Sequence, residues 1–118
     1  MRILIVEDES SIRENIEEML QLKGIETKGV ENAIQALRHL EEFNPTLILC
    51  DLMMPEMNGI DFLLRIKQDP RFANIPLIFV SARAEVSERE KALELGAIDF
   101  ITKPFVFRDI LALIEKYS

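Results

Sequence analysis

Two hydrophobic periods alternate along the chain. Short runs of aliphatic residues, typical of buried strands, are followed by segments in which apolar residues recur every three or four positions, as on one face of a helix. This pattern predicts five strands, over residues 2–6, 25–29, 46–50, 76–81 and 98–102. It predicts five helices, over residues 11–22, 31–42, 58–68, from near 87 to 96, and 106–117.

Strands that alternate with helices predict a mainly parallel sheet covered by helices on both faces. The third and fourth strands are apolar almost throughout, as strands buried on both faces should be. Right-handed crossovers leave few topologies, and the doubly wound, flavodoxin-like order 2-1-3-4-5 fits best. We therefore expect an α/β protein of the (βα)5 type, with residues 1–118 forming one domain.

Local signals indicate how the helices begin. Ser11 and Glu14 have the spacing of a capping box at the start of the first helix. Glu9 is better interpreted as a solvated loop residue or an N-cap than as a functional acid. Gly59 is expected to allow tight packing near the start of the third helix.

Composition narrows the class of protein. There are 14 basic against 21 acidic residues, and the net charge of −7 argues against non-specific binding of nucleic acid or anionic membrane. The single cysteine, Cys50, cannot form an internal disulfide and is expected to be buried. No apolar run approaches the roughly 20 residues that span a bilayer, and there is no pattern of a secretory signal. We expect a soluble, cytoplasmic protein.

Polar side chains collect where the predicted strands end. Glu7 and Asp8 follow the first strand, Asp51 the third, Ser81 ends the fourth, and Lys103 follows the fifth. Each alone has an ordinary structural interpretation, such as a loop cap or a solvent-facing charge. The carboxyl ends of parallel strands share one edge, however, where such folds bind ligands. Carboxylates gathered there repel one another, which favours a functional site over a purely structural one.

Clustered carboxylates indicate a metal site, because Mg²⁺ prefers carboxylate and water oxygens. A carboxylate whose charge is offset by a metal can act as a nucleophile towards phosphorus. The transferred phosphoryl group then needs donors for its oxygens, and Lys103 and Ser81 are the available ones. The chemistry that the residues favour is phosphorylation of Asp51.

Four segments give the chain a resemblance to the receiver domain of the two-component response-regulator family. They are ILIVEDE at 3–9, LILCDLMMPEMNG at 47–59, FVSA at 79–82 and FITKPF at 100–105. The resemblance implies a phosphorylation-dependent signalling switch rather than an enzyme with a separate substrate. A histidine kinase or histidine phosphotransfer protein would donate the phosphoryl group, and an effector or output domain would respond.

The resemblance also implies individual roles. Asp51 is the expected phospho-acceptor, Lys103 would pair with the phosphoryl group, and Ser81 would hydrogen-bond it in the active state. Mg²⁺, or Mn²⁺ in its place, would be bound directly by Asp8, with Glu7 helping, often through water. Asp51 and the backbone carbonyl of Met53 would complete the metal site. The Lys103–Pro104 peptide bond is expected to be cis.

The family's switch couples the hydroxyl of the fourth strand to an aromatic residue of the fifth, here Phe100. An ordinary half-buried strand residue is an equally good interpretation of Phe100. The output face of the family is formed by the last two helices and the strand between them. In the last helix Val106, Leu113 and Tyr117 widen the apolar arc, which indicates either a well-buried helix or a surface for a partner or a homodimer.

Two further residues bear on the lifetime of the phosphorylated state. Met53 and Arg83 correspond to positions that vary within the family and flank the path of the hydrolytic water. A thioether cannot orient a water by hydrogen bonding as an amide or carboxylate could. We therefore expect slow loss of the phosphoryl group.

Other functions fit less well. In a flavin mononucleotide carrier, Glu7, Asp8 and Glu9 would repel the phosphate of the cofactor. An aspartyl phosphatase usually has a second acid at the position of Met53. The main alternative is a pseudo-receiver, an interaction module that is not phosphorylated, although such modules typically lack one of the key residues. The sequence leaves open the cognate kinase, the output, and whether the domain acts alone or within a longer regulator.

Overall fold

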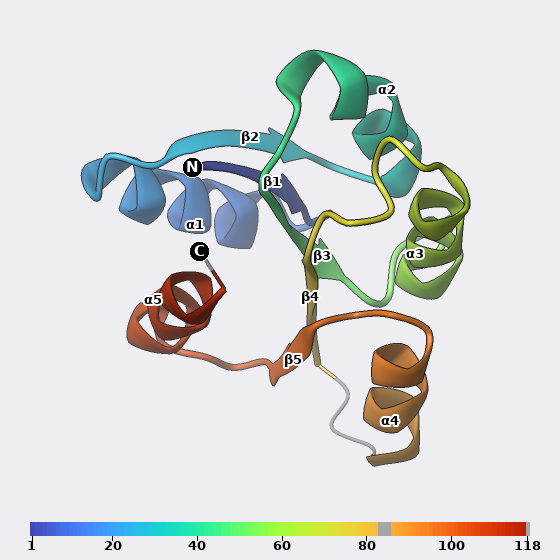
Figure 1. Cartoon of the computed structure of the whole chain (residues 1–118). Helices are drawn as coiled ribbons and strands as arrows, with labels where there is room; N and C mark the ends of the chain where they lie inside the picture. Colours follow the sequence, from blue (N-terminus) through green and yellow to red (C-terminus); the bar gives the residue numbers. More distant parts are fainter. Residues whose placement is uncertain (83–85, 118) are drawn as a thin grey trace.

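The apolar runs form a five-stranded sheet whose strands are all parallel, in the order β2-β1-β3-β4-β5 (Figure 1). The computed structural model describes residues 1–82 and 86–117. The predicted fold class and strand order are confirmed. The strands are β1 (Arg2–Val6), β2 (Glu26–Val30), β3 (Leu47–Asp51), β4 (Leu77–Ser81) and β5 (Asp99–Thr102). The helices are α1 (Ser10–Leu22), α2 (Ala33–Phe43), α3 (Gly59–Gln68), α4 (Val86–Glu94) and α5 (Phe107–Lys116).

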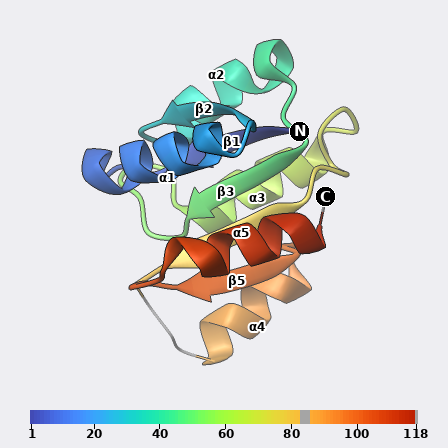
Figure 2. The same cartoon turned by 90° about the vertical axis from the view of Figure 1, so that its left-hand side faces the viewer.

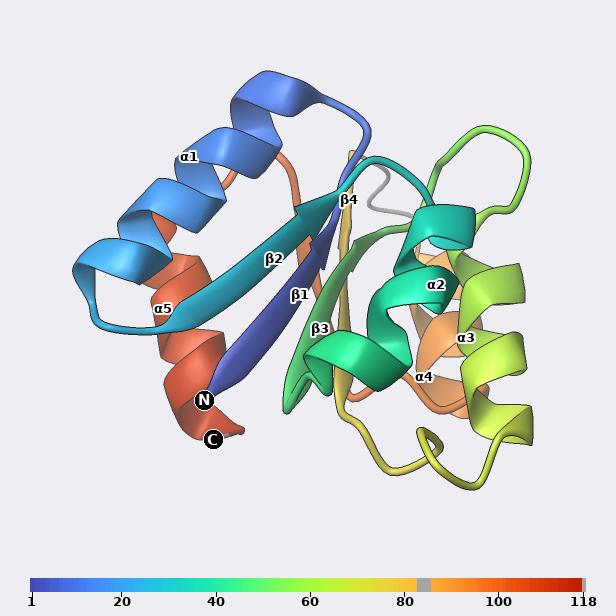
Figure 3. The same ribbon diagram turned by 90° about the horizontal axis from the view of Figure 1, so that it is seen from above.

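Helices cover both faces of the sheet, α1 and α5 on one side and α2, α3 and α4 on the other (Figure 3). The side chains of each strand alternate between the two layers. In β4, Ile78 and Val80 pack towards α1 and α5, whereas Leu77 and Phe79 pack towards the other three helices. Within the described residues, no helix has the length and apolar character needed to cross a membrane.

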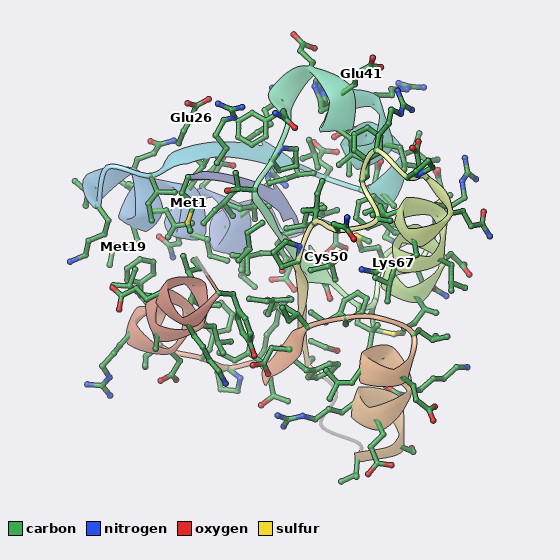
Figure 4. The ribbon with its side chains drawn as sticks, viewed as in Figure 1. Met1, Met19, Glu26, Glu41, Cys50 and Lys67 are labelled. Carbon is green, nitrogen blue, oxygen red and sulfur yellow. The ribbon has the colours of Figure 1, made fainter. Side chains whose placement is uncertain are left out.

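The central strands are fully buried. Every residue of β3 and β4 is shielded from solvent, which explains why their sequences are nearly continuous apolar runs. Cys50 lies in β3 near the middle of the sheet, as Figure 4 shows, and is completely buried. The prediction that this cysteine is a core residue is confirmed.

Several boundaries differ from the predicted ones. The strand predicted over residues 25–29 is shifted by one, because pairing with β1 sets Val30 opposite Val6. The capping box of Ser11 and Glu14 is wrong: α1 begins at Ser10, its N-cap is Glu9, and no side chain makes a cap hydrogen bond. The alternative interpretation of Glu9 as an N-cap is confirmed.

Gly59 lies where α3 begins against the end of β3. A Cβ atom at this position would be 2.7 Å from the Phe79 ring, 2.8 Å from the backbone oxygen of Asp51 and 2.9 Å from the Cα of Leu52. Two of these three neighbours are backbone atoms, which cannot move aside without shifting the end of β3. The expectation that Gly59 permits tight packing is confirmed.

Gly59→Ala is therefore expected to lower the free energy of unfolding by about 1–3 kcal/mol, the usual range for overpacking a close contact. Urea unfolding measures the effect. Gly29→Ala is the matched control, since its Cβ would meet the flexible side chains of Glu17 and Arg13 instead of backbone. That control should change stability by less than about 1 kcal/mol, and equal losses in both variants would contradict the argument.

Candidate functional site

The ends of neighbouring strands bring the predicted site residues to one edge of the sheet. Strand pairing sets Asp51 of β3 opposite Val80, the residue before Ser81. It also sets Ser81 opposite Thr102, the residue before Lys103. The backbone N–H of Lys103 donates to the carbonyl oxygen of Ser81 at 2.7 Å, which extends the ladder by one residue.

Lys103 contacts two carboxylates at this edge. Its ammonium nitrogen lies 2.7 Å from Oε1 of Glu7 and 3.4 Å from Oδ2 of Asp51. Both acids are buried, with 2% of Glu7 and 6% of Asp51 exposed. The sequence predicted this convergence, but it did not predict that the lysine would lie closer to Glu7 than to Asp51.

Backbone donors hold the two buried carboxylates in place. The N–H of Met53 donates to Oδ1 of Asp51 at 3.1 Å, and the N–H of Glu9 donates to Oε2 of Glu7 at 3.1 Å. The guanidinium of Arg13 donates to the backbone oxygen of Glu7 at 2.8 Å. Sequence reasoning missed Arg13, and the only signal for it was a basic residue in the first turns of a helix that starts beside an acidic loop.

The site carries more negative charge than its lysine offsets. Burial raises the pKa of Glu7 to about 7, despite the opposing hydrogen bonds from Lys103 and Glu9. Burial also raises the pKa of Asp51, and the charge of Lys103 acts against that shift. For Lys103, burial favours the neutral amine, but its hydrogen bond to Glu7 and the charge of Asp51 outweigh burial and raise its pKa. An additional cation would therefore be favoured here.

The donor set fits a hard divalent cation. Glu7, Asp8 and Asp51 each offer a carboxylate oxygen, and these oxygens lie within 4.8 Å of one another. Asp8 is exposed whereas the other two acids are buried, so the cluster has an open side where water can complete a coordination shell. Mg²⁺ prefers a few carboxylate oxygens together with several waters.

Ser81 and Phe100 are both buried. Ser81 has no exposed surface at the end of β4, and Phe100 is 4% exposed in β5. The ring centroid of Phe100 lies 6.4 Å from that of Phe79, with the planes tilted by 58°. The interpretation of Phe100 as a half-buried residue is wrong, because its ring points into the layer beneath α4.

Further predictions concern the Lys103–Pro104 peptide bond, Met53, Arg83 and the last helix. The Lys103–Pro104 peptide bond is cis, as predicted. Met53 is 49% exposed beside Asp51, and the metal-binding role of its carbonyl stays a prediction. Arg83 lies outside the described residues. In the last helix Ile110 and Ile114 face the core.

The apolar arc of the last helix extends to its exposed side. Val106 is 53% exposed, and Leu113 and Tyr117 are partly buried. The three residues are thus accessible, as the partner-surface interpretation requires, while the contact with a partner stays a prediction.

The fold and the site define the class of protein: a doubly wound α/β protein with an acidic cluster and a lysine at the carboxyl edge of its parallel sheet. The family model of the response regulator receiver domain matches residues 3–115, and the chain belongs to this family of two-component systems. The regulatory protein PhoB of the phosphate regulon is 41% identical over 113 residues in Pseudomonas aeruginosa and 40% over 114 in Escherichia coli. These alignments cover 96% and 97% of this chain but 49% and 50% of the relatives, so the chain spans about half their length.

Solved structures agree with this assignment. The receiver domain of a signal transduction histidine kinase from Syntrophus aciditrophicus is 34% identical, with a TM-score of 0.88, over 98% of this chain and 88% of that one. The chemotaxis protein CheY4 of Vibrio cholerae matches with a TM-score of 0.94 over 99% and 98% of the two chains. Its identity is 22%, so this second likeness supports the fold alone.

Proposed function

We propose that residues 1–118 act as one receiver domain, a phosphorylation-dependent switch in which Asp51 accepts a phosphoryl group. The observation that carries the proposal is the buried Asp51 carboxylate, with Oδ2 3.4 Å from the ammonium of Lys103 and a second buried acid, Glu7, on the same lysine. A histidine kinase or a histidine phosphotransfer protein is the proposed donor. The domain catalyses its own phosphoryl transfer and dephosphorylation and has no separate substrate.

In the proposed transfer, an oxygen of Asp51 forms a bond to phosphorus as the bond from phosphorus to the donor's histidine nitrogen breaks. The hydrogen bond from the Met53 N–H fixes the orientation of the carboxylate. The ammonium of Lys103 and the hydroxyl of Ser81 would donate to the phosphoryl oxygens, where negative charge gathers. This edge of the sheet thus supplies the nucleophile and two donors.

Glu7, Asp8, Asp51 and the backbone carbonyl of Met53 would hold Mg²⁺, or Mn²⁺, at this edge. The bound ion would supply positive charge that reduces the repulsion between Asp51 and the incoming phosphoryl oxygens. The carboxylate oxygens of Glu7, Asp8 and Asp51, which lie within 4.8 Å of one another, support this role.

The proposed readout is a change in the face formed by α4, β5 and α5. Ser81 would move towards the phosphoryl group and the equilibrium of Phe100 would shift further towards the buried position, with packing alone as the signal. Apolar side chains on and beside these elements are exposed, as a partner surface requires: Val86 67%, Leu93 39%, Ile98 39% and Val106 53%. A downstream effector, an output domain or a second copy of the domain would bind this face. The acidic domain itself is proposed to bind neither nucleic acid nor membrane.

The experiment that tests the proposal is intact-mass measurement after incubation with acetyl phosphate and Mg²⁺. We expect one added phosphoryl group, located on Asp51 by peptide mapping and absent when a chelator removes the metal. Calorimetry with Mg²⁺ alone serves as the control for metal binding. If Mg²⁺ binds and no phosphoryl group is added, the switch is contradicted and the pseudo-receiver alternative is favoured.

The phosphorylated state is expected to be lost slowly. The side chain beside the acceptor is Met53, whose thioether is a poor hydrogen-bonding group for water. Met53→Asn should speed the loss by about tenfold, equivalent to about 1.4 kcal/mol in the barrier, by giving the water a donor and an acceptor. The decay of the added mass over time measures the rate. A half-life of seconds in the unaltered protein would contradict this prediction.

A further inference from the structure

A hydrogen bond joins the end of α5 to the edge strand β5, which lies beside it (Figure 2). The phenol of Tyr117, the residue that caps α5, donates to Oδ2 of Asp99 at 2.8 Å. The same phenol lies 3.4 Å from the backbone oxygen of Ile98. Tyr117 is partly buried against the layer formed by α1 and α5. The contact thus lies on the face of the sheet opposite to the Phe100 ring.

Asp99 links this contact to the backbone of Phe100. Its other carboxylate oxygen, Oδ1, accepts the N–H of Phe100 at 2.8 Å. The ring of Phe100 is buried on the α4 side of the sheet, against Phe79. The carboxylate of Asp99 therefore holds both the backbone N–H of Phe100 and the end of α5.

We infer that Asp99 and Tyr117 are positioning residues for the switch. They hold Phe100 in its buried position and couple that position to the end of α5. The inference rests on the proposed function of Asp51. The structure shows the buried Phe100 and the intact contact between Tyr117 and Asp99 together. If phosphorylation favours the conformation in which the Phe100 ring is buried, it should also favour the hydrogen bond between Tyr117 and Asp99, because both belong to the same conformation.

The chain contains its own probe for this contact. Tyr117 is the single tyrosine and there is no tryptophan, so tyrosine fluorescence reports on this residue alone. A phenol that donates to a carboxylate fluoresces less than one that faces water. Phosphorylation with acetyl phosphate and Mg²⁺ should therefore lower the fluorescence of Tyr117. The decrease should be lost in Asp99→Asn and in Phe100→Ala.

A second measurement does not depend on fluorescence. Tyr117→Phe should shift the equilibrium away from the buried state about fivefold, the factor that the usual net contribution of one hydrogen bond gives, and should therefore slow phosphorylation by acetyl phosphate. Thr27→Val is the matched control. It removes the 2.9 Å hydrogen bond between Gln21 of α1 and Thr27 of β2, which joins a helix on the same face to the other edge strand. The control should phosphorylate at the unaltered rate.

The outcomes separate this inference from the proposed function. If intact mass shows the phosphoryl group on Asp51 while the fluorescence of Tyr117 is unchanged or rises, the inference is overturned and the switch stands. Equal rates for Tyr117→Phe and Thr27→Val, with both variants folded by circular dichroism, also overturn it. If no phosphoryl group is added at all, the proposed function fails first and the positioning role fails with it.

Discussion

Asp51→Asn is expected to take up no phosphoryl group from acetyl phosphate and Mg²⁺, while the fold stays intact. An amide oxygen can still accept the Met53 N–H, which lies 3.1 Å from Oδ1 of Asp51, so the loop after β3 keeps its anchor. The amide is not a nucleophile towards phosphorus, so no bond to the phosphoryl group forms. Intact-mass measurement over the time course that fully modifies the parent protein gives the result.

The Asp51→Asn substitution should abolish phosphorylation without lowering the stability of the fold. Burial raises the pKa of Asp51, which means that folding works against the charged carboxylate. Removing that charge should leave the free energy of unfolding within about 1 kcal/mol of the parent value, or raise it. Asp61→Asn is the control, because Asp61 is an exposed acid in the first turn of α3 and should leave phosphorylation unchanged. Equal phosphorylation of Asp51→Asn and the parent would contradict the assignment of the acceptor.

The fold could be predicted because its determinants are local. Apolar runs such as those of β3 and β4 contain only residues that a doubly covered strand buries, and parallel strands place all their carboxyl ends at one edge. The meeting of Asp51, Ser81 and Lys103 follows from that geometry alone. No side-chain contact had to be known.

The details of the site depend on tertiary contacts that a sequence pattern does not contain. Lys103 has a long, flexible side chain, and no spacing in the sequence indicates that its ammonium lies 2.7 Å from Glu7 and 3.4 Å from Asp51. Similarly, α1 begins at Ser10 after the N-cap Glu9, whose N–H donates to the Glu7 carboxylate, and the spacing of Ser11 and Glu14 misled the prediction. The partnership of Asp99 with Tyr117 joins residues 18 positions apart and has no motif.

Lys103→Met is expected to lower the free energy of unfolding by about 3 kcal/mol in the presence of a chelator at neutral pH, since it removes one partner of a buried ion pair. The ammonium lies within 3.4 Å of both Glu7 and Asp51, and methionine keeps the length of the side chain without its charge. The variant must then bury two carboxylates with no lysine between them, or take up a proton on one of them. Urea unfolding gives the value.

Magnesium provides the decisive comparison for this variant. With the ammonium gone, the carboxylates of Glu7, Asp8 and Asp51 should attract a divalent cation more strongly, so saturating Mg²⁺ should stabilise Lys103→Met more than the parent. Lys28→Met, which removes an exposed lysine of β2, should leave both the stability and the response to Mg²⁺ unchanged. If Lys103→Met is as stable as the parent in chelator and gains no more from Mg²⁺, then the lysine does not offset the charge of the acidic cluster. The surplus negative charge would in that case be relieved by protonation of Glu7, whose pKa burial raises to about 7.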